Sequence, residues 1–177
     1  MPSVMEKSTC CTCQKPKATL ECGVCKDSVC KNCAQFLDEE SFSFLAQIPA
    51  DLAHSTYCIP CYDSKVATEL EAYNEIMEQA KDIHVFEKDQ GKETRFFKRL
   101  EKPVTVENCP DREETLLRLA FFAAKGGFNT IIDVNVHSAK VRSGSYQTLK
   151  WTGYGIPTTV DERRLNKKER ARSPSRR

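Results

Sequence analysis

The most regular spacing of apolar residues in the first half of the chain follows the last of its clustered cysteines. Four residues recur at steps of four, three and four, which places them on one helical face: Val66, Leu70, Tyr73 and Met77. Glu and Lys fill most of the other positions, and Asp63 or Ser64 can cap the start. The pattern predicts a linking helix over residues 63–82 that ends near Lys81.

Shorter apolar segments follow this helix. Ile83–Glu87 and Phe96–Glu107 are predicted as strands, separated by a loop at Lys88–Glu93. Pro103 lacks a backbone N–H, so it places the second strand at a sheet edge or delays its start.

A strongly apolar helix is predicted after Asp111, which is placed to cap it with Glu114 three residues on. Seven of the residues that make it apolar are Leu116, Leu117, Leu119, Ala120, Phe121, Ala123 and Ala124. A helix with so many apolar positions is expected to be buried against a sheet or another subunit. Gly126-Gly127 predicts its end.

The last regular segment predicts a β-hairpin. Thr130–Val136 is expected to be a strand with three apolar side chains on one face: Ile132, Val134 and Val136. Ser143-Gly144-Ser145 is expected to form the turn, and Tyr146–Ile156 the return strand, which Pro157 ends.

Two glycines in the return strand, Gly153 and Gly155, predict a close backbone approach or a bulge. Together these elements predict an α+β fold for residues 83–160: a small antiparallel sheet packed by one apolar helix. Residues 1–9 and 161–177 are expected to be a disordered arm and a disordered basic tail.

Cysteine dominates the region before the linking helix. Eight cysteines form four Cys-x-x-Cys pairs, separated by 8, 4 and 24 residues: Cys10/Cys13, Cys22/Cys25, Cys30/Cys33 and Cys58/Cys61. Each pair offers two sulfurs on one tight turn, and two pairs complete a tetrahedral site for Zn²⁺. The sequence therefore predicts two structural zinc ions per chain, bound by residues 10–62. Spacing alone leaves interleaved and sequential pairing open.

The gap between the third and fourth pairs, Ala34–Tyr57, is unusually apolar. It contains seven large apolar residues: Phe36, Leu37, Phe42, Phe44, Leu45, Ile48 and Leu52. We expect them to form a small core over the second metal, and an exposed subset would offer a patch for a protein partner.

The cysteine spacing resembles that of FYVE-type cross-brace zinc fingers over residues 8–80, and the short gap between the second and third pairs is its most telling part. The resemblance implies a treble-clef-like fold in which alternate pairs share a zinc. The first site would then be Cys10, Cys13, Cys30 and Cys33, and the second Cys22, Cys25, Cys58 and Cys61. Cys11 is an extra thiol beside the first site.

The chain departs from the lipid-binding members of that family. They carry a run of Arg and His before the third pair, whereas this chain reads Lys26-Asp27-Ser28-Val29 there. Phosphoinositide binding needs concentrated positive charge, so this gap favours a protein-binding finger. RING-type ubiquitin ligases place a His among the middle ligands, and His54 has no such position.

Residues 83–160 resemble the YbjQ family of heavy-metal-binding proteins. Ala123–Ile132 matches the family's helix-to-strand segment, and Gly153–Ile156 matches its last strand loosely. The family implies an α+β unit that assembles into rings. Five residues are the only candidates for a separate metal site here: His84, His137, Cys109, Asp133 and Asn135. Only Asp133 and His137 have a spacing that could suit a shared ion, and four residues along one strand, about 13 Å, is too far. We interpret Asp133 and His137 as ordinary surface residues.

The net charge of +2 hides a split along the chain. Residues 1–80 have six Lys/Arg and twelve Asp/Glu, whereas residues 161–177 have eight Lys/Arg and three Asp/Glu. Met1–Thr9 has no apolar core of a signal peptide, and no stretch is long enough for a membrane span. In a reducing compartment, paired cysteines favour metal over disulfides. We therefore expect a cytoplasmic zinc protein.

The function predicted from these features is that of a non-enzymatic zinc adaptor. The finger would bind an unknown protein partner, and the second domain would form homo-oligomers. One alternative is nucleic-acid binding through the tail, Arg163–Arg177. Another is an enzyme, either a ubiquitin ligase or a redox-active thiol protein. Less expected is a phosphoinositide-binding finger.

Overall fold

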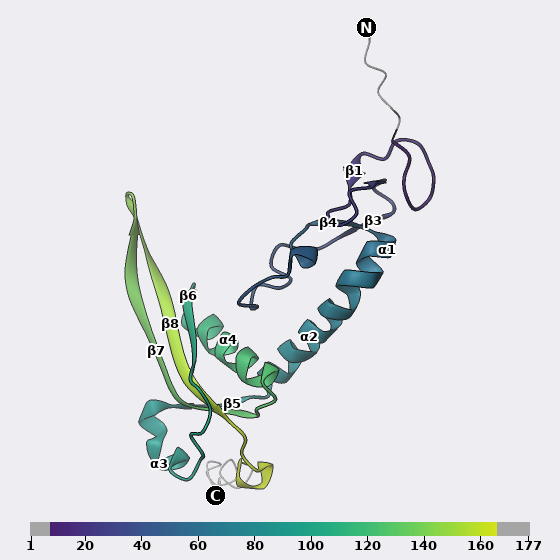
Figure 1. The fold of residues 1–177 in the computed structure, drawn as a ribbon. Coiled ribbons are helices and arrows are strands. Elements are labelled where there is room, and N and C mark those ends of the chain that lie inside the picture. Colours follow the sequence, from purple (N-terminus) through teal and green to yellow (C-terminus); the bar gives the residue numbers. More distant parts are fainter. Residues whose placement is uncertain (1–7, 166–177) are drawn as a thin grey trace, which may run out of the picture. The chain divides into compact units, whose positions relative to one another are not determined.

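The computed structural model describes residues 8–165 of the chain (Figure 1). The chain divides into two compact units, Met1–Glu75 and Ile76–Arg177. The division falls inside helix α2 (Ala67–Lys81), and each unit has a hydrophobic cluster of its own. The architecture is mixed α+β, as predicted.

The first unit is built from very short strands. β1 (Leu20–Glu21) pairs antiparallel with β2 (Ser28–Val29), and β3 (Ala34–Phe36) pairs antiparallel with β4 (Thr56–Cys58). The buried cluster of this unit consists half of cysteine: Cys10, Ala18, Cys22, Val29, Ala34 and Cys58. So small an apolar cluster cannot stabilise the unit by itself.

We call the segment between the third and fourth cysteine pairs, Ala34–Tyr57, the insert. Its residues between β3 and β4 form a second small core, as predicted in part. The buried members are Leu37, Phe42, Phe44 and Leu52, the last in the 3-10 helix η1 (Ala50–Leu52), whereas Phe36 and Ile48 are 60% and 39% exposed. Tyr73 from α2 completes this core. Its ring packs edge-to-face on Phe42 at 5.3 Å, and its hydroxyl accepts a hydrogen bond from the Phe44 backbone N–H at 3.3 Å.

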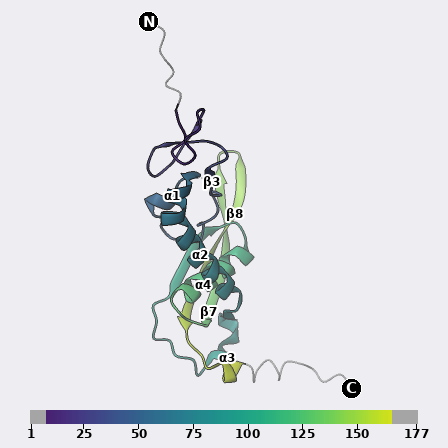
Figure 2. The same cartoon turned by 90° about the vertical axis from the view of Figure 1, so that its right-hand side faces the viewer.

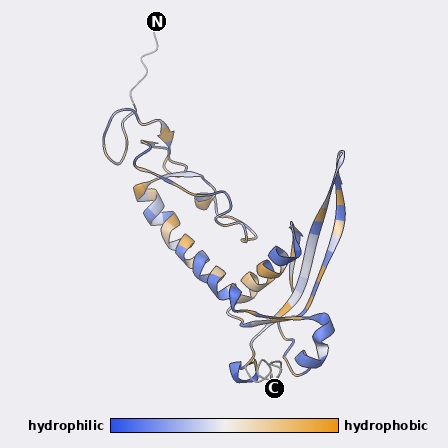
Figure 3. Cartoon of the chain, turned by 180° about the vertical axis from the view of Figure 1, so that it is seen from behind, coloured by the Kyte–Doolittle hydropathy of each residue, from blue (hydrophilic) through white to orange (hydrophobic). Residues whose placement is uncertain are grey.

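The linking helix starts earlier than predicted. Helical structure begins at Ile59 and runs through α1 (Ile59–Cys61), the π-helical turn η2 (Tyr62–Val66) and α2, which ends at Lys81 as expected. Cys58 is the N-cap residue, and a proline in the first turn suits a helix start because its missing N–H has no partner there anyway. The predicted caps at residues 63 and 64 are therefore wrong. Apolar segments recur between polar ones along α2 (Figure 3).

The second unit contains a four-stranded sheet with the order β5-β7-β8-β6. The strands are β5 (His84–Glu87), β6 (Val104–Cys109), β7 (Thr130–Ser143) and β8 (Tyr146–Thr158). β6, β8 and β7 are antiparallel, but β5 pairs parallel with β7, so the sheet is mixed and the antiparallel prediction is wrong for its edge. A long connection between β5 and β7 allows them to run in the same direction.

Helix α4 (Arg112–Lys125) packs on β6, β7 and β8. Asp111 caps it as predicted, because its carboxylate accepts the Glu114 backbone N–H at 2.7 Å. Leu119 and Ala123 lie in the main buried cluster of this unit with Val106, Cys109, Ile131 and Val134. Gly126 is the C-cap, and Gly127 follows with a φ of +78°, which glycine adopts without strain.

The segment between β5 and β6 differs from the prediction. It contains the 3-10 helix η3 (Lys88–Gln90) and the short helix α3 (Gly91–Thr94) instead of a loop. The predicted strand Phe96–Glu107 begins only at Val104, directly after Pro103. A local reason for the helical turn is the capping box, in which the Gln90 side chain accepts the Glu87 backbone N–H at 2.8 Å.

A bulge at Asp133 changes which residues of β7 face the core. The strand register shifts between Ile132 and Asn135, and Asp133 has a φ of +53°. As a result Ile131 and Val134 share the buried cluster, so the prediction of Ile132 and Val134 on one face is wrong.

Asp133 is also not an ordinary surface residue, as its ion pair with Arg99 shows. The guanidinium donates to both carboxylate oxygens at 2.6 and 3.0 Å. These hydrogen bonds hold the pKa of the Asp133 carboxyl below its usual value. The same Arg99 side chain donates to the backbone carbonyls of Thr94 and Phe97, so one ion pair ties the segment after α3 to β7.

The β7–β8 hairpin is longer than predicted, and Pro157 lies inside β8 instead of ending it. β5 pairs with β7 as far as Val134, and β6 pairs with β8 from Trp151 onward. Beyond these points β7 and β8 pair only with each other among the described strands (Figures 1 and 2). We call residues 138–150 the distal ribbon. Its exposed large apolar side chains are Val141, Tyr146 and Leu149.

Ordered structure reaches further toward both ends than predicted. Ser8 exchanges hydrogen bonds with Ala18, and Thr9 forms a bridge with Pro16. Residues 162–165 form a helical turn in which Leu165 is buried. The rest of the predicted arm and tail, residues 1–7 and 166–177, lies outside the described residues.

Gly153 lets α4 approach the sheet. A Cβ at Gly153 would lie 2.5 Å from Thr115 Cγ2 and 3.0 Å from Leu119 Cδ1, whereas a Cβ at Gly91 would meet nothing within 4 Å. We predict that Gly153→Ala lowers the free energy of unfolding by about 2 kcal/mol, because overpacking forces the helix away. Urea unfolding followed by the fluorescence of Trp151, the single tryptophan, measures this. Gly91→Ala is the control, and equal midpoints for the two variants would contradict the prediction.

Candidate metal centres

The structure gathers eight cysteine sulfurs into two groups of four. One group is Cys10, Cys13, Cys30 and Cys33, and the other is Cys22, Cys25, Cys58 and Cys61; within each group the sulfurs lie within 4.8 Å of one another. We call them tetrad 1 and tetrad 2. The pairing is interleaved, as the FYVE-type resemblance implied. Each tetrad could hold a metal ion.

Tetrads 1 and 2 each begin with the same local turn. The carbonyl of the first cysteine accepts the backbone N–H of the residue after the second: Gln14 to Cys10, and Lys26 to Cys22, both at 3.0 Å. Gln14 and Lys26 have φ values of 60° and 65°. This left-handed residue turns the chain sharply, so that the two sulfurs of a Cys-x-x-Cys pair face one point.

The β1–β2 hairpin explains why the pairs interleave. Leu20 pairs with Val29 and Glu21 with Ser28, so Cys22 and Cys25 lie at the tip of the hairpin and Cys30 lies at its base. The hairpin thereby separates Cys22/Cys25 from Cys30/Cys33 in space, although these two pairs are neighbours in the sequence. Cys30 instead meets the first pair, and its backbone N–H donates to Cys10 Sγ at 3.4 Å.

Tetrad 2 is completed from the far end of the insert. β3 pairs with β4 so that Ala34, directly after Cys33, lies opposite Cys58. Cys58 and Cys61 lie at the N-cap and in the first turn of the helix. The β3–β4 pair therefore places Cys33 of tetrad 1 close to Cys58 of tetrad 2, and the start of α1 supplies both Cys58 and Cys61.

The distances between sulfurs fit a bound ion. Cys13 Sγ and Cys30 Sγ are 3.7 Å apart, and Cys25 Sγ and Cys58 Sγ are 3.8 Å apart. A tetrahedron with Zn–S bonds of about 2.3 Å places its sulfurs about 3.8 Å apart, whereas a disulfide needs about 2.05 Å. None of the ten cysteines forms a disulfide in the structure.

Backbone amides favour one thiolate in each tetrad. N–H donors from Cys13 and Cys30 lower the pKa of Cys10 to about 6. Burial opposes ionisation of Cys22, but N–H donors from Cys58 and Cys25 outweigh it and also lower that pKa to about 6.

Other sulfurs of the tetrads hold their protons. Hydrogen bonds with Cys30 and Cys13 raise the pKa of Cys33 to about 12. Burial raises the pKa of Cys25 to about 11, and it also raises the pKa of Cys58. Four sulfurs this close cannot all ionise without a cation, so a divalent ion is the natural counter-charge of each tetrad.

The remaining two cysteines lie outside both tetrads. Cys11 is half-buried, and its sulfur lies 3.8 Å from the Thr12 hydroxyl. Cys109 is 1% exposed and packs in the core of the second unit as a small apolar residue.

His54 has a structural position that the sequence did not suggest. A Cβ at Gly23, inside the Cys22–Cys25 turn, would collide with the His54 ring, so only glycine fits beneath it. The Gly23 backbone N–H donates to the Thr56 carbonyl at 2.9 Å. The end of the insert therefore packs directly on the turn that supplies tetrad 2.

The five candidate ligands in the second unit do not come together. In residues 8–165 the two cysteine tetrads are the only groups of three or more potential ligands at metal-binding distance. Asp133 is paired with Arg99, and His137 and Asn135 are exposed.

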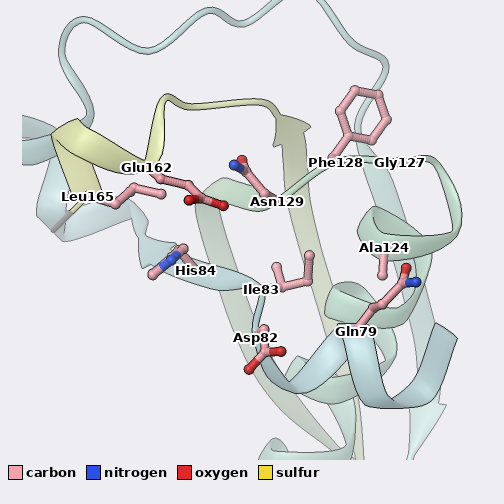
Figure 4. Close-up of a pocket in the computed structure, with 10 residues that line it drawn as sticks. All are labelled: Gln79, Asp82, Ile83, His84, Ala124, Gly127, Phe128, Asn129, Glu162 and Leu165. Carbon is pink, nitrogen blue, oxygen red and sulfur yellow. The ribbon is translucent and has the colours of Figure 1, made fainter. Parts of the chain in front are cut away.

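His84 lines a pocket of about 510 Å³ in this unit (Figure 4). One of its polar side chains, Asn129, already has partners within the fold. Its amide group donates to the Val160 carbonyl at 2.7 Å, and its amide oxygen accepts the Val160 backbone N–H at 2.9 Å. Asp82 and Glu162 supply its carboxylates.

Comparison with known proteins gives no relative for this chain. No protein-family model, curated protein or solved structure matches it. The resemblances to FYVE-type fingers and to the YbjQ family therefore depend only on the residues quoted above. No helix within residues 8–165 has the length and apolar character needed to cross a membrane.

The pKa pattern predicts proton release on metal binding. At pH 7 the raised pKa values keep Cys33, Cys25 and Cys58 protonated, and each must lose its proton to bind zinc. Filling both tetrads should therefore release at least three protons, and apparent affinity should rise with pH. Calorimetric titration in two buffers of different ionisation enthalpy counts them. Ca²⁺, which prefers oxygen ligands, is the control. Fewer than three protons would contradict the prediction.

Proposed function

We propose that this chain is a non-enzymatic zinc adaptor whose first unit is a two-zinc, treble-clef-like interaction finger. The observation that carries the proposal is the pair of complete cysteine tetrads with sulfur spacings near 3.8 Å. Four thiolates in a tetrahedron favour zinc among the available metals.

The ligand set supports a structural role for the metal. Catalytic zinc sites keep one position open for water or substrate, whereas each tetrad supplies four protein sulfurs. The same argument weakens a redox role, because a sulfur bound to zinc is not a free member of a dithiol pair. It also weakens the ligase alternative, since His54 packs on Gly23 and belongs to neither tetrad.

The charge of the finger supports a protein partner over an anionic lipid head group. The gap before the third cysteine pair has one cation, Lys26, and one anion, Asp27, and the backbone carbonyl of Asp27 accepts the Cys22 N–H. Residues 8–75 have five Lys/Arg and ten Asp/Glu. Two tetrads filled with zinc would add about two negative charges each. A phosphate group would meet repulsion on such a unit.

Adjacent cysteines provide a matched test of the metal sites. We predict two zinc ions per chain by mass spectrometry of the metal content, one or none for Cys10→Ser, and two for Cys11→Ser. Cys10 is a member of tetrad 1 and Cys11 is not, although they are neighbours in sequence. Fluorescence of Trp151 checks that the second unit stays folded. Two ions in the Cys10→Ser protein would contradict the assignment.

For the second unit we propose homo-oligomerisation through the distal ribbon. The apolar helix α4 no longer argues for a subunit interface, because Leu119, Phe121 and Ala123 are already buried within the chain. The ribbon is different, since a two-stranded hairpin alone is marginally stable in water. In the ribbon, the Tyr146 side chain is 79% exposed and the Leu149 side chain 50% exposed. Within the described residues, no further strand pairs with either edge of the ribbon.

The mass in solution tests this second role. We predict that the chain elutes as a multiple of 20.1 kDa in light-scattering chromatography, and that Tyr146→Ser with Leu149→Ser reduces the mass to one chain. Leu100→Ser is the control, since Leu100 is 82% exposed in the same unit but outside the ribbon. A monomeric wild-type protein would contradict the prediction.

A further inference from the structure

A pocket of about 340 Å³ lies in the first unit, between the segment Leu37–Phe42 and the segment Ile48–Ser55 of the insert. Leu37, Phe42 and Leu52 provide buried apolar walls, and each is less than 8% exposed. Ile48 adds a fourth apolar side chain that is 39% exposed. The pocket therefore offers an apolar interior with one accessible apolar wall.

Two carboxylates line the same pocket. Asp38 and Glu39 are exposed, and neither forms an ion pair with another described residue. Among the acidic residues of the insert, only Asp51 forms an ion pair with a described residue, with Lys65 at 3.2 Å. The free carboxylates thus lie beside the apolar interior, within a unit whose acidic residues outnumber the basic ones.

Tetrad 2 fixes one wall of this pocket. His54 lies on Gly23 of the Cys22–Cys25 turn, and its backbone N–H donates to the Tyr57 hydroxyl at 3.1 Å. The opposite wall is joined to it, because the Leu37 N–H donates to the Ser55 carbonyl at 3.0 Å. Metal binding would therefore hold the pocket open in one shape before a partner arrives, which lowers the ordering cost of binding.

We infer that this pocket binds a peptide segment with a bulky apolar residue next to Lys or Arg. A volume of about 340 Å³ is at the lower end of ligand pockets, so it suits one large side chain and its neighbours. The apolar walls would take that side chain, and Asp38 and Glu39 would pair with the adjacent cation. Acidic and phosphorylated segments would be repelled. The inference depends on the proposed interaction role of the finger and names its partner class.

A selection experiment tests this specificity without a known partner. The zinc-loaded full chain is used to select from a phage-displayed library of random peptides, and the enriched peptides are synthesised for affinity measurement. We expect the enriched peptides to share Leu, Ile, Met, Phe or Trp beside Lys or Arg. An enriched acidic motif, or no enrichment above an empty support, would overturn the inference.

Matched variants locate the binding. The double change Asp38→Lys with Glu39→Lys should weaken the best peptide about tenfold or more, whereas Glu40→Lys, next in sequence but outside the pocket, should change affinity less than about twofold. Ile48→Ser should weaken binding about tenfold, and Phe36→Ser, 60% exposed and outside the pocket, should not. Equal effects of the pocket and control variants would overturn the assignment of the site.

Metal analysis separates this inference from the proposed function. A chain that contains two zinc ions and a folded finger but selects no basic apolar peptide would leave the zinc assignment standing and refute the pocket. A chain without zinc would refute the proposed function itself.

Discussion

The fold of the first unit depends on placing four sulfurs around one positive ion, twice. The apolar cluster around the tetrads contains only three buried residues other than cysteine, Ala18, Val29 and Ala34, and the strands beside it are two or three residues long. The second core, in the insert, is also small. Such a segment cannot offset its conformational entropy by apolar burial alone. The cysteines supply the missing stabilisation only when a cation neutralises them, because close thiolates repel one another.

This constraint extends from the sulfurs to the surface. The short β1–β2 hairpin separates the second cysteine pair from the third, so closing the unit would take one ion in each tetrad. Closing tetrad 2 sets Cys58 at the start of the linking helix and brings the end of the insert onto Gly23. The pocket between the two ends of the insert then follows from the metal-bound framework. In the proposed function the zinc ions would do no chemistry, and their contribution would be the shape of the acidic, partly apolar surface beside them.

Features set by local chemistry could be predicted from the sequence. The cap at Asp111, the turn at Gly144 and the end of α2 each depend on neighbouring residues. The cysteine pairs were equally visible, because two sulfurs on one turn have few uses other than metal binding. Their interleaving came only through the FYVE-type resemblance, since it depends on how a hairpin separates them in space.

The features that the sequence did not reveal arise from distant contacts. Arg99 reaches Asp133 across 34 positions, and the bulge at Asp133 reverses the alternation of β7 beyond it. The parallel pairing of β5 depends on the whole connection to β7. The early helix start is an exception, because its signal is local: Pro60 lacks the backbone N–H that would have no partner in the first turn. His54 packs on Gly23, 31 positions away in the sequence, and this packing role is visible only in the folded chain.

The most direct test of the account is nuclear magnetic resonance of the chain with ¹¹³Cd in place of zinc, with correlations from each ion to cysteine β-protons. The account predicts two resonances typical of all-sulfur coordination. One should correlate with Cys10, Cys13, Cys30 and Cys33, and the other with Cys22, Cys25, Cys58 and Cys61. Sequential pairing, a single ion, or an oxygen or nitrogen ligand in either site would contradict it.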